Sequence, residues 1–220
     1  MGGGLPLDLI LFGMIAAFLV LRLRSILGRR TGFERSESGP VQVPGLGRPI
    51  APVIDAKAEP VAPVRPVPDP ASPVGAALAQ FRRVDRNFDP AHFLSGAEAA
   101  FRLIVGAFAA GDRVALRPLL NDETYRSFEQ AIAAREAQGE TQRSEIRGVQ
   151  QVSIEAANLA GTTGTITVKF VSDQIAETLD KDGRPVAGTD AVIEITDLWT
   201  FERDLSQSDP AWRLAAARSG

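Results

Sequence analysis

The chain has 220 residues, of which 45% are hydrophobic and 23% are charged, and this average is typical of a globular protein. It has no cysteine and a single histidine, which excludes disulfides, thiolate nucleophiles and cysteine-based zinc sites and argues against a histidine-rich metal site. We therefore expect no metal and no cofactor. The net charge of −3 gives no reason to expect nucleic acid as a partner.

The composition changes along the chain. Ten of the fifteen prolines lie between Pro40 and Pro73. Residues 1–74 carry 8 basic and 6 acidic side chains, a balance of +2, whereas residues 75–220 carry 16 and 21, a balance of −5. The chain therefore divides into three parts: an apolar anchor with a basic cluster (1–32), a proline-rich disordered linker (33–74) and a mildly acidic domain (75–220).

The first part is predicted to be a membrane-spanning helix. The seventeen residues from Leu5 to Leu21 contain one charge, at Asp8, and would span about 26 Å, close to the ~30 Å hydrocarbon core of a bilayer. Four arginines follow and can contact lipid headgroups: Arg22, Arg24, Arg29 and Arg30. An interfacial helix and a signal peptide are the alternatives, although a signal peptide carries its positive charge before the apolar run. Because the arginines follow the run, we expect the C-terminal side to be cytoplasmic.

The second part is predicted to be a tether. Its repeated X-Pro pairs favour polyproline II conformation over helix, and fully extended it would reach about 125 Å. The spacing of Pro60, Pro63 and Pro66 also fits a ligand for an aromatic groove, but such spacings occur by chance in any proline-rich tract. We expect a spacer that keeps the domain near the membrane without fixing its position.

The third part begins with helices and ends with strands. The apolar spacing predicts helices over 75–88 and from about Phe93 to Ala110, a short helix after Asp112, and a helix from Asn121 or Asp122 to Gly139. After Gly139 the apolar period becomes two, which predicts strands with turns at residues 158–163 and 180–183. This order is typical of an α+β fold in which N-terminal helices pack on one face of a curved antiparallel sheet.

Several segments in both halves of this domain resemble one family. They are Gly96–Glu98, Ala107–Ala109, Gly111–Asp112 and Leu116–Leu120 among the helices, and Thr196–Phe201 and Asp209–Leu214 in the sheet. Together they are similar to the C-terminal domain of subunit 44 of the mitochondrial inner-membrane import translocase. Residues Leu9 to Arg30 resemble the single-helix anchor of that family's alphaproteobacterial relatives.

This resemblance implies a cone-shaped fold similar to nuclear transport factor 2 or cystatin, and a non-enzymatic adaptor. The expected location is a bacterial inner membrane, with a single span and a cytoplasmic domain. The implied partners are anionic lipid and a protein at the membrane, such as a translocon or chaperone subunit. A membrane helix and a proline spacer replace the charged upstream region that helps to recruit a chaperone in the mitochondrial relative, so only the docking role carries over.

Two sets of candidate site residues lie in the domain. Arg82, Arg83 and Arg86 either contact anionic lipid or form a solvated helix face. A second set either lines a pocket for an acyl chain or peptide or simply forms the core: Phe101, Ile104, Phe108, Tyr125, Phe128, Phe170, Asp197, Trp199, Phe201 and Trp212.

Asp197 is the most informative carboxylate in this set. Strict alternation places it on the apolar face of its strand, where we expect a β-bulge that turns it outward or a backbone hydrogen bond that satisfies it. One alternative function is a small-molecule isomerase or dehydratase with Asp197 and Tyr125 as its acid–base pair. Another is a periplasmic secretion-channel assembly factor of similar architecture.

Overall fold

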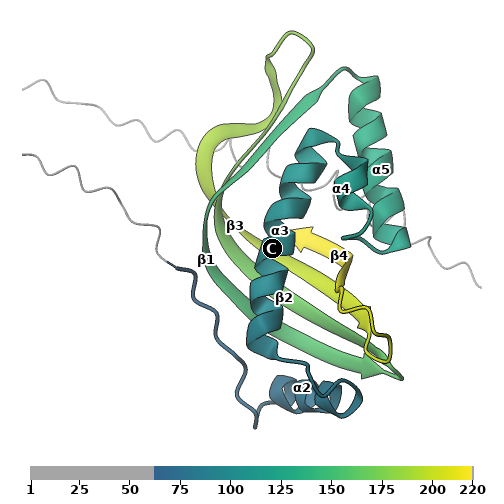
Figure 1. The fold of residues 1–220 in the computed structure, drawn as a ribbon. Coiled ribbons are helices and arrows are strands. Elements are labelled where there is room, and N and C mark those ends of the chain that lie inside the picture. The colour runs from purple at the N-terminus through teal and green to yellow at the C-terminus, as the bar shows by residue number, and fades with distance from the viewer. Residues whose placement is uncertain (1–61, 220) are drawn as a thin grey trace, which may run out of the picture. The chain divides into compact units, whose positions relative to one another are not determined.

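The computed structural model describes residues 62–219, which contain four helices followed by four strands (Figure 1). The predicted membrane anchor and most of the predicted linker lie outside the described residues. The elements are α2 (Pro73–Val84), α3 (Pro90–Ala110), α4 (Arg113–Leu116), α5 (Asp122–Ala137), β1 (Thr141–Ala160), β2 (Thr163–Leu179), β3 (Pro185–Asp204) and β4 (Arg213–Ser219).

Local capping groups set the ends of the helices. The Asp89 carboxylate accepts a hydrogen bond from the Ala91 N–H at the start of α3, and the helix ends at Gly111, whose φ of 70° suits a residue without a side chain. The Asn121 side chain accepts from the Thr124 N–H at 2.8 Å and begins α5. These results confirm the predicted ends at Gly111 and Asn121.

The first helix is shifted from its predicted position. It begins at Pro73, where the Ser72 hydroxyl accepts a hydrogen bond from the Gly75 N–H at 3.0 Å, and ends at Val84 instead of residue 88. Asp85 adopts an extended backbone conformation and donates its N–H to the Phe81 carbonyl, which closes the last turn. Arg86 therefore lies in the turn after α2 and not on the helix.

The four strands form one antiparallel sheet in the order β1-β2-β3-β4, which confirms the predicted meander. The first three strands have 20, 17 and 20 residues and are longer than the sequence pattern indicated. Register shifts mark β-bulges, which bend a sheet. One shift lies between Gln174 and Ala176 of β2. Close to it on β3, Gly188 has a positive φ of 79°, and the Ala176 carbonyl leaves no room there for a Cβ atom.

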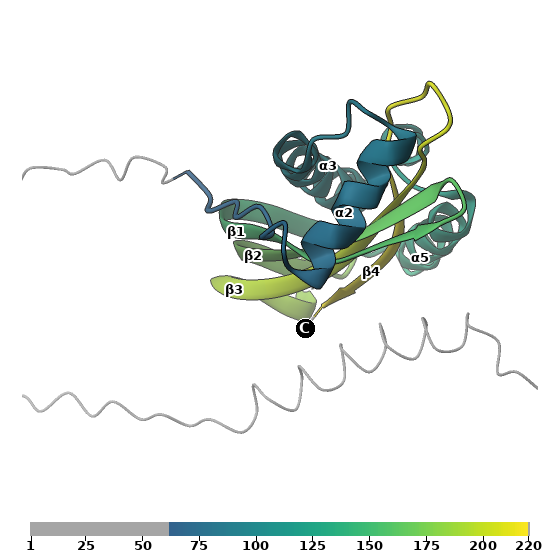
Figure 2. The same ribbon diagram turned by 90° about the horizontal axis from the view of Figure 1, so that it is seen from below.

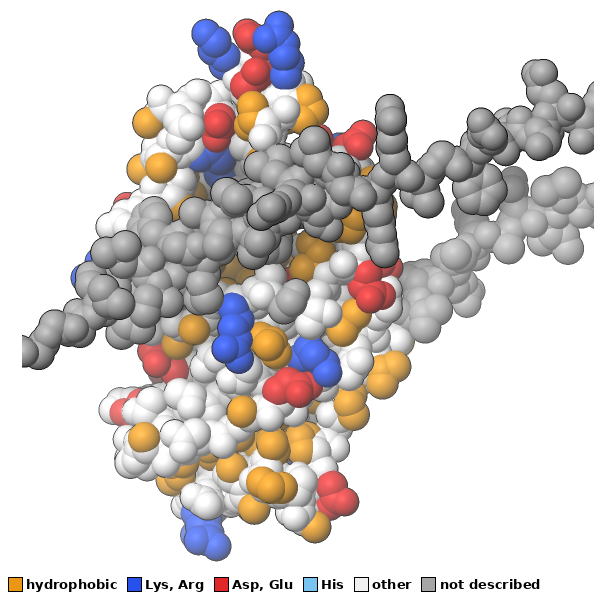
Figure 3. Space-filling model, turned by 180° about the vertical axis from the view of Figure 1, so that it is seen from behind, with side chains coloured by type: hydrophobic (Ala, Val, Ile, Leu, Met, Phe, Trp, Pro, Cys, Tyr) orange, Lys and Arg blue, Asp and Glu red, His pale blue; other side chains and the backbone are white. Residues whose placement is uncertain are grey.

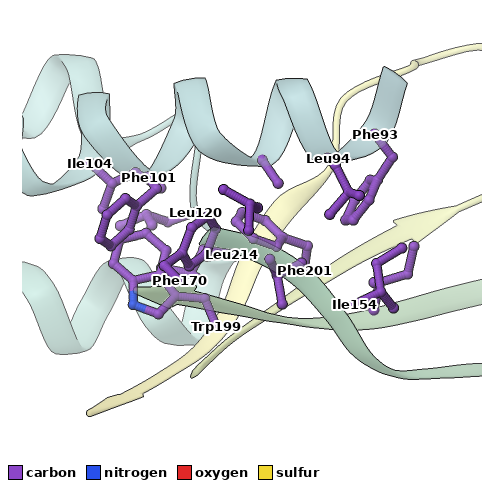
Figure 4. Close-up of a cluster of buried hydrophobic side chains, with 14 of the residues drawn as sticks. Phe93, Leu94, Phe101, Ile104, Leu120, Ile154, Phe170, Trp199, Phe201 and Leu214 are labelled. Atoms are coloured by element: carbon purple, nitrogen blue, oxygen red, sulfur yellow. The ribbon is translucent and has the colours of Figure 1, made fainter. Parts of the chain in front are cut away.

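All four helices lie on one side of the sheet (Figures 1 and 2). The long helix α3 crosses the concave face, α2 packs near one end of it, and α4 and α5 lie near the other end. The core fills the layer between α3 and the strands (Figure 4), with fully buried side chains that include Phe81, Leu94, Phe101, Ile104, Ile166, Phe170, Phe201 and Leu214. The predicted α+β fold is confirmed.

Among residues 62–219, α3 is the helix that is long and apolar enough to cross a membrane. Its buried side chains, among them Leu94, Phe101 and Ile104, pack against the strands of the sheet. The apolar composition of α3 is therefore explained by its place as the core helix of the domain.

Candidate functional site

An aromatic cluster fills the layer between α3 and the middle of the sheet (Figure 4). The ring of Phe101 on α3 stacks on that of Phe170 on β2, with centroids 4.3 Å apart and planes 5° apart. Trp199 on β3 meets Phe101 edge-on at 4.7 Å. With Ile104 and Phe201, these five candidate pocket residues are buried and belong to the hydrophobic core.

The other four aromatic candidates lie at the margins of the core and are partly buried. Trp212 meets the ring of Phe93 edge-on at 4.9 Å, at the end of the sheet near α2. Phe108 and Phe128 meet at 4.8 Å between α3 and α5, and the guanidinium of Arg117 lies 4.9 Å from the centre of the Tyr125 ring. The structure therefore divides the predicted pocket set between the core centre and two separate edges.

Asp197 remains on the concave face of β3, directly opposite Phe170 of β2, and is 8% exposed. Among residues 62–219, neither the expected outward bulge nor the expected backbone hydrogen bond is found at this carboxylate. Instead, one carboxylate oxygen accepts from the Ser219 hydroxyl at 2.8 Å and the other from the Gln174 side-chain amide at 3.0 Å. The same amide also donates to the Ser172 hydroxyl at 2.9 Å. Side chains from the two neighbouring strands, β2 and β4, therefore satisfy this carboxylate of β3.

Burial sets the electrostatics of this polar cluster. Removal from water raises the pKa of Asp197 above its ordinary value, and the hydrogen bonds from Ser219 and Gln174 oppose that rise. Tyr125, the residue considered as an acid–base partner, makes no hydrogen bond to Asp197 in the described chain; its ring instead contacts Arg117. Within residues 62–219, no group of three acidic or histidine side chains is arranged to hold a metal ion.

The end of α2 carries a basic surface. We use the name α2 basic surface for Arg82, Arg83, Val84 and Arg86, all of which are exposed. The Nε atom of Arg82 donates to the Phe88 carbonyl, and this bond holds the turn that follows the helix. Asp85, the acidic residue within this stretch, points away and pairs with an arginine of β3. The local positive charge is therefore not neutralised by its sequence neighbour.

The rear face of the domain differs from the α2 basic surface in the distribution of its charged side chains. On its visible part, basic and acidic side chains are interspersed and do not gather by sign (Figure 3). Elsewhere in the sheet charges are also paired, as in the contact of Lys169 on β2 with Glu155 on β1 at 3.1 Å. The α2 basic surface is therefore the stronger candidate for contact with an anionic partner.

The chain before α2 contacts the domain in a way that the sequence did not indicate. We call residues 62–68 the strap. Val64 pairs with the outer strand β1, and the Arg65 guanidinium donates two hydrogen bonds to Glu98 on α3, at 2.6 and 3.1 Å. We expected a free spacer to residue 74, but the chain already contacts the domain at Val64. The sequence of the strap is proline-rich like the rest of the tract, so no local sequence pattern distinguishes it.

Comparison of the sequence with models of known protein families identifies the domain. A model described as the Tim44-like domain matches residues 74–219. The chain belongs to the Tim44-like domain family. The match begins at the first turn of α2 and includes every strand, and it indicates a membrane-associated binding domain related to translocation. No curated protein matches the sequence.

Solved structures also resemble the Tim44-like domain. One is the intermembrane space region of the chloroplast protein ARC6, at 11% identity, with a TM-score of 0.41 and coverage of 57% of this chain and 94% of that one. Another is an NTF2-like family protein from Streptomyces avermitilis, at 14% identity and a TM-score of 0.33, with coverage of 56% and 92%. A third is a conserved protein from Planctomyces limnophilus, at 14% identity and a TM-score of 0.31, with coverage of 55% and 89%.

Proposed function

We propose that this protein is a single-pass inner-membrane adaptor whose tethered Tim44-like domain docks a protein or lipid partner at the cytoplasmic face. The family match supports a translocation-related binding role. The apolar run from Leu5 to Leu21 and the arginines after it support an anchor whose C-terminal side is cytoplasmic.

The α2 basic surface is the observation that carries the proposal. Arg82, Arg83 and Arg86 are exposed together, while Asp85 is held against Arg203 at 3.0 Å. Basic side chains near an anionic membrane each contribute about 1 kcal/mol, and an anchor raises the effective concentration of the surface that it tethers. The same three arginines also suit an acidic segment of a protein partner.

We propose binding and not catalysis for the interior of the domain. Asp197 is fully engaged by Ser219 and Gln174, and the aromatic side chains around it pack on one another. A general base needs a substrate within hydrogen-bond reach and a suitable partner group. The Asp197–Tyr125 pair of the isomerase alternative has no direct hydrogen bond to support it.

The proposal is tested by crosslinking in membranes. The full chain is crosslinked in its native membrane, solubilised in mild detergent and compared with a variant in which Arg82, Arg83 and Arg86 are changed to Gln. The control changes three exposed arginines elsewhere, Arg143, Arg147 and Arg184. Translocon or chaperone subunits, or anionic lipid, should be recovered with the wild type and the control but not with the α2 variant. Recovery that is the same for all three chains would contradict the proposal.

Orientation is tested separately with a reporter fused after Gly220. Activity in the cytoplasm is the expected result, because the positive charges lie on the C-terminal side of the apolar run. A reporter that is active only in the periplasm would overturn the orientation and favour a secretion-channel assembly factor.

A further inference from the structure

The outer edge of β1 accepts an extended chain in parallel. This strand is at one side of the sheet, because its partner within the sheet is β2. On its other side the Val64 N–H donates to the Gln150 carbonyl at 2.9 Å, and the Val152 N–H donates to the Val64 carbonyl at 3.0 Å. The strap thus shows the pairing geometry that this edge selects.

A buried carboxylate lies beside the same edge. Glu98 of α3 is 7% exposed, and one of its oxygens accepts both hydrogen bonds from Arg65. Its other oxygen accepts from Arg102, one helical turn along α3. A cation placed directly after the bridging residue is therefore recognised by charge and by the planar geometry of its guanidinium.

The strap fills this edge only in part. Each second residue of a strand bonds to the same neighbour, so the next donor after Val64 would be residue 66. That residue is Pro66, which has no N–H, and pairing stops after one bridge. The side chains of Val64 and Val67 remain 64% and 51% exposed. A segment with an N–H at the third position can form a longer ladder than the strap does.

We propose that the outer edge of β1, together with Glu98, is a docking site for an extended, proline-poor segment of a partner polypeptide with a basic residue directly after the bridging residue, and that the strap occupies it as a displaceable internal ligand. This rests on the proposed adaptor function and names the chemistry of its protein partner. Tethering keeps the strap at high local concentration, so it excludes weak ligands and yields to segments that form more hydrogen bonds.

Two matched substitutions test whether the strap occupies the site. V64P removes the N–H that donates to Gln150, and V67P is the control, since both valines follow a proline and have largely exposed side chains. In the full chain in detergent, V64P should speed hydrogen exchange of the Val152 amide at least several-fold, and V67P should not. R65E is a second variant, which removes the hydrogen bonds from Arg65 to Glu98 and so releases the strap. It should also speed hydrogen exchange of the Val152 amide. Equal exchange in all four chains would overturn the proposal.

The partner chemistry is tested with a peptide added to the same chains. The probe copies residues 62–68 with P66V, and its control carries P66V and R65E. The probe should shift the amide resonances of Gln150 and Val152, and it should bind V64P several-fold more tightly than it binds wild type or V67P. Its affinity should exceed that of the control peptide with R65E by about tenfold or more. Binding that is absent, or equal for V64P and V67P, would overturn the docking site. If membrane partners still crosslink to the α2 basic surface in that case, the proposed adaptor function is retained and only the proposed docking site at β1 is rejected.

Discussion

Arg203 near the end of β3 forms an ion pair with Asp85, 118 residues earlier in the chain, at 3.0 Å. The two side chains are only 12% and 15% exposed, so the pair is largely removed from water. Its position ties the turn after α2 to the sheet and holds the Asp85 carboxylate against β3. The pair therefore fixes the turn after α2 and engages Asp85 away from Arg82, Arg83 and Arg86, while Asp89 in the same turn remains exposed.

The first prediction concerns this pair. Asp85→Asn leaves the Arg203 guanidinium largely buried with a single remaining bond, to the Asp209 carbonyl. We expect a loss of about 2–4 kcal/mol in unfolding free energy, since removing one partner of a buried pair strands the other charge. Both tryptophans, Trp199 and Trp212, lie in the domain, so urea unfolding of the full chain in detergent can be followed by their fluorescence.

Its control is Asp182→Asn, which removes the pair with Arg184 in the β2–β3 turn. Those side chains are 52% and 77% exposed, so the expected change is within about 0.5 kcal/mol. Equal losses of stability in the two variants would contradict the claim that the buried pair of Asp85 and Arg203 stabilises the fold more than an exposed pair does.

The second prediction concerns the aromatic stack. Phe101→Ala removes a fully buried ring that stacks on Phe170 and contacts Trp199, and it should cost about 3–5 kcal/mol. Leu103→Ala on the same helix is the control, because Leu103 is 60% exposed. Its expected cost is below about 1 kcal/mol. Similar losses in the two variants would contradict the packing of α3 on the sheet.

The third prediction concerns the pH dependence of Asp197. Burial raises the pKa of this carboxyl in the folded chain, so the folded state holds its proton more tightly than the unfolded state does. This contribution to stability is fully present below the unfolded pKa and is lost as the pH rises through the folded pKa. Asp197→Asn remains neutral, so its stability relative to wild type should increase as the pH rises from the ordinary aspartate pKa through the raised pKa of the folded chain.

Asp204 provides a control of the opposite sign. Hydrogen bonds from Ser206 lower the pKa of Asp204 from 3.8 to about 2. Its contribution to stability is therefore present above the unfolded pKa and is lost as the pH falls toward 2. Asp204→Asn should be less stable than wild type at pH 7 and equal to it at low pH. Parallel pH profiles for the two variants would refute both assignments.

The Asp197→Asn chain also tests for catalysis. The adaptor function predicts that this variant retains its crosslinking partners and its activity in cells, because within residues 62–219 the carboxylate forms its hydrogen bonds with Ser219 and Gln174 inside the domain. Loss of cellular activity in a variant that still folds would favour the isomerase alternative.

The fourth prediction concerns the α2 basic surface. The chain has no cysteine, so Asn87→Cys places a single fluorophore in the turn after α2, and Val114→Cys places one on α4 as a reference. In nanodiscs with about 30% anionic lipid, headgroup-attached quenchers should quench the Asn87 site more strongly than the Val114 site.

Salt and sequence provide its controls. Raising the salt from about 0.1 M to about 0.5 M shortens the screening length and should reduce quenching at Asn87. Changing Arg82, Arg83 and Arg86 to Gln should have the same effect at low salt, and neutral lipid should abolish the difference between the two sites. Quenching that is independent of charge would rule out electrostatic docking of this surface.

Local sequence chemistry determined the order of elements and several of their ends. Pro90 after Asp89, and Gly111 at the other end, define α3 because a proline suits the first helical turn and a glycine the left-handed residue after the last. Alternation likewise predicted that Asp197 and Trp199 share one face of their strand, since side chains in a strand alternate with period two.

The tertiary structure decided what those side chains meet. Asp197 is satisfied by Gln174 and Ser219, 23 and 22 residues away, and Arg65 reaches Glu98 across 33 residues. The proline tract and its arginine were visible in the sequence, but the edge of β1 that receives them was not. Local propensity acts over a few neighbouring residues, whereas strand register and burial bring distant groups together only after the sheet has formed around α3.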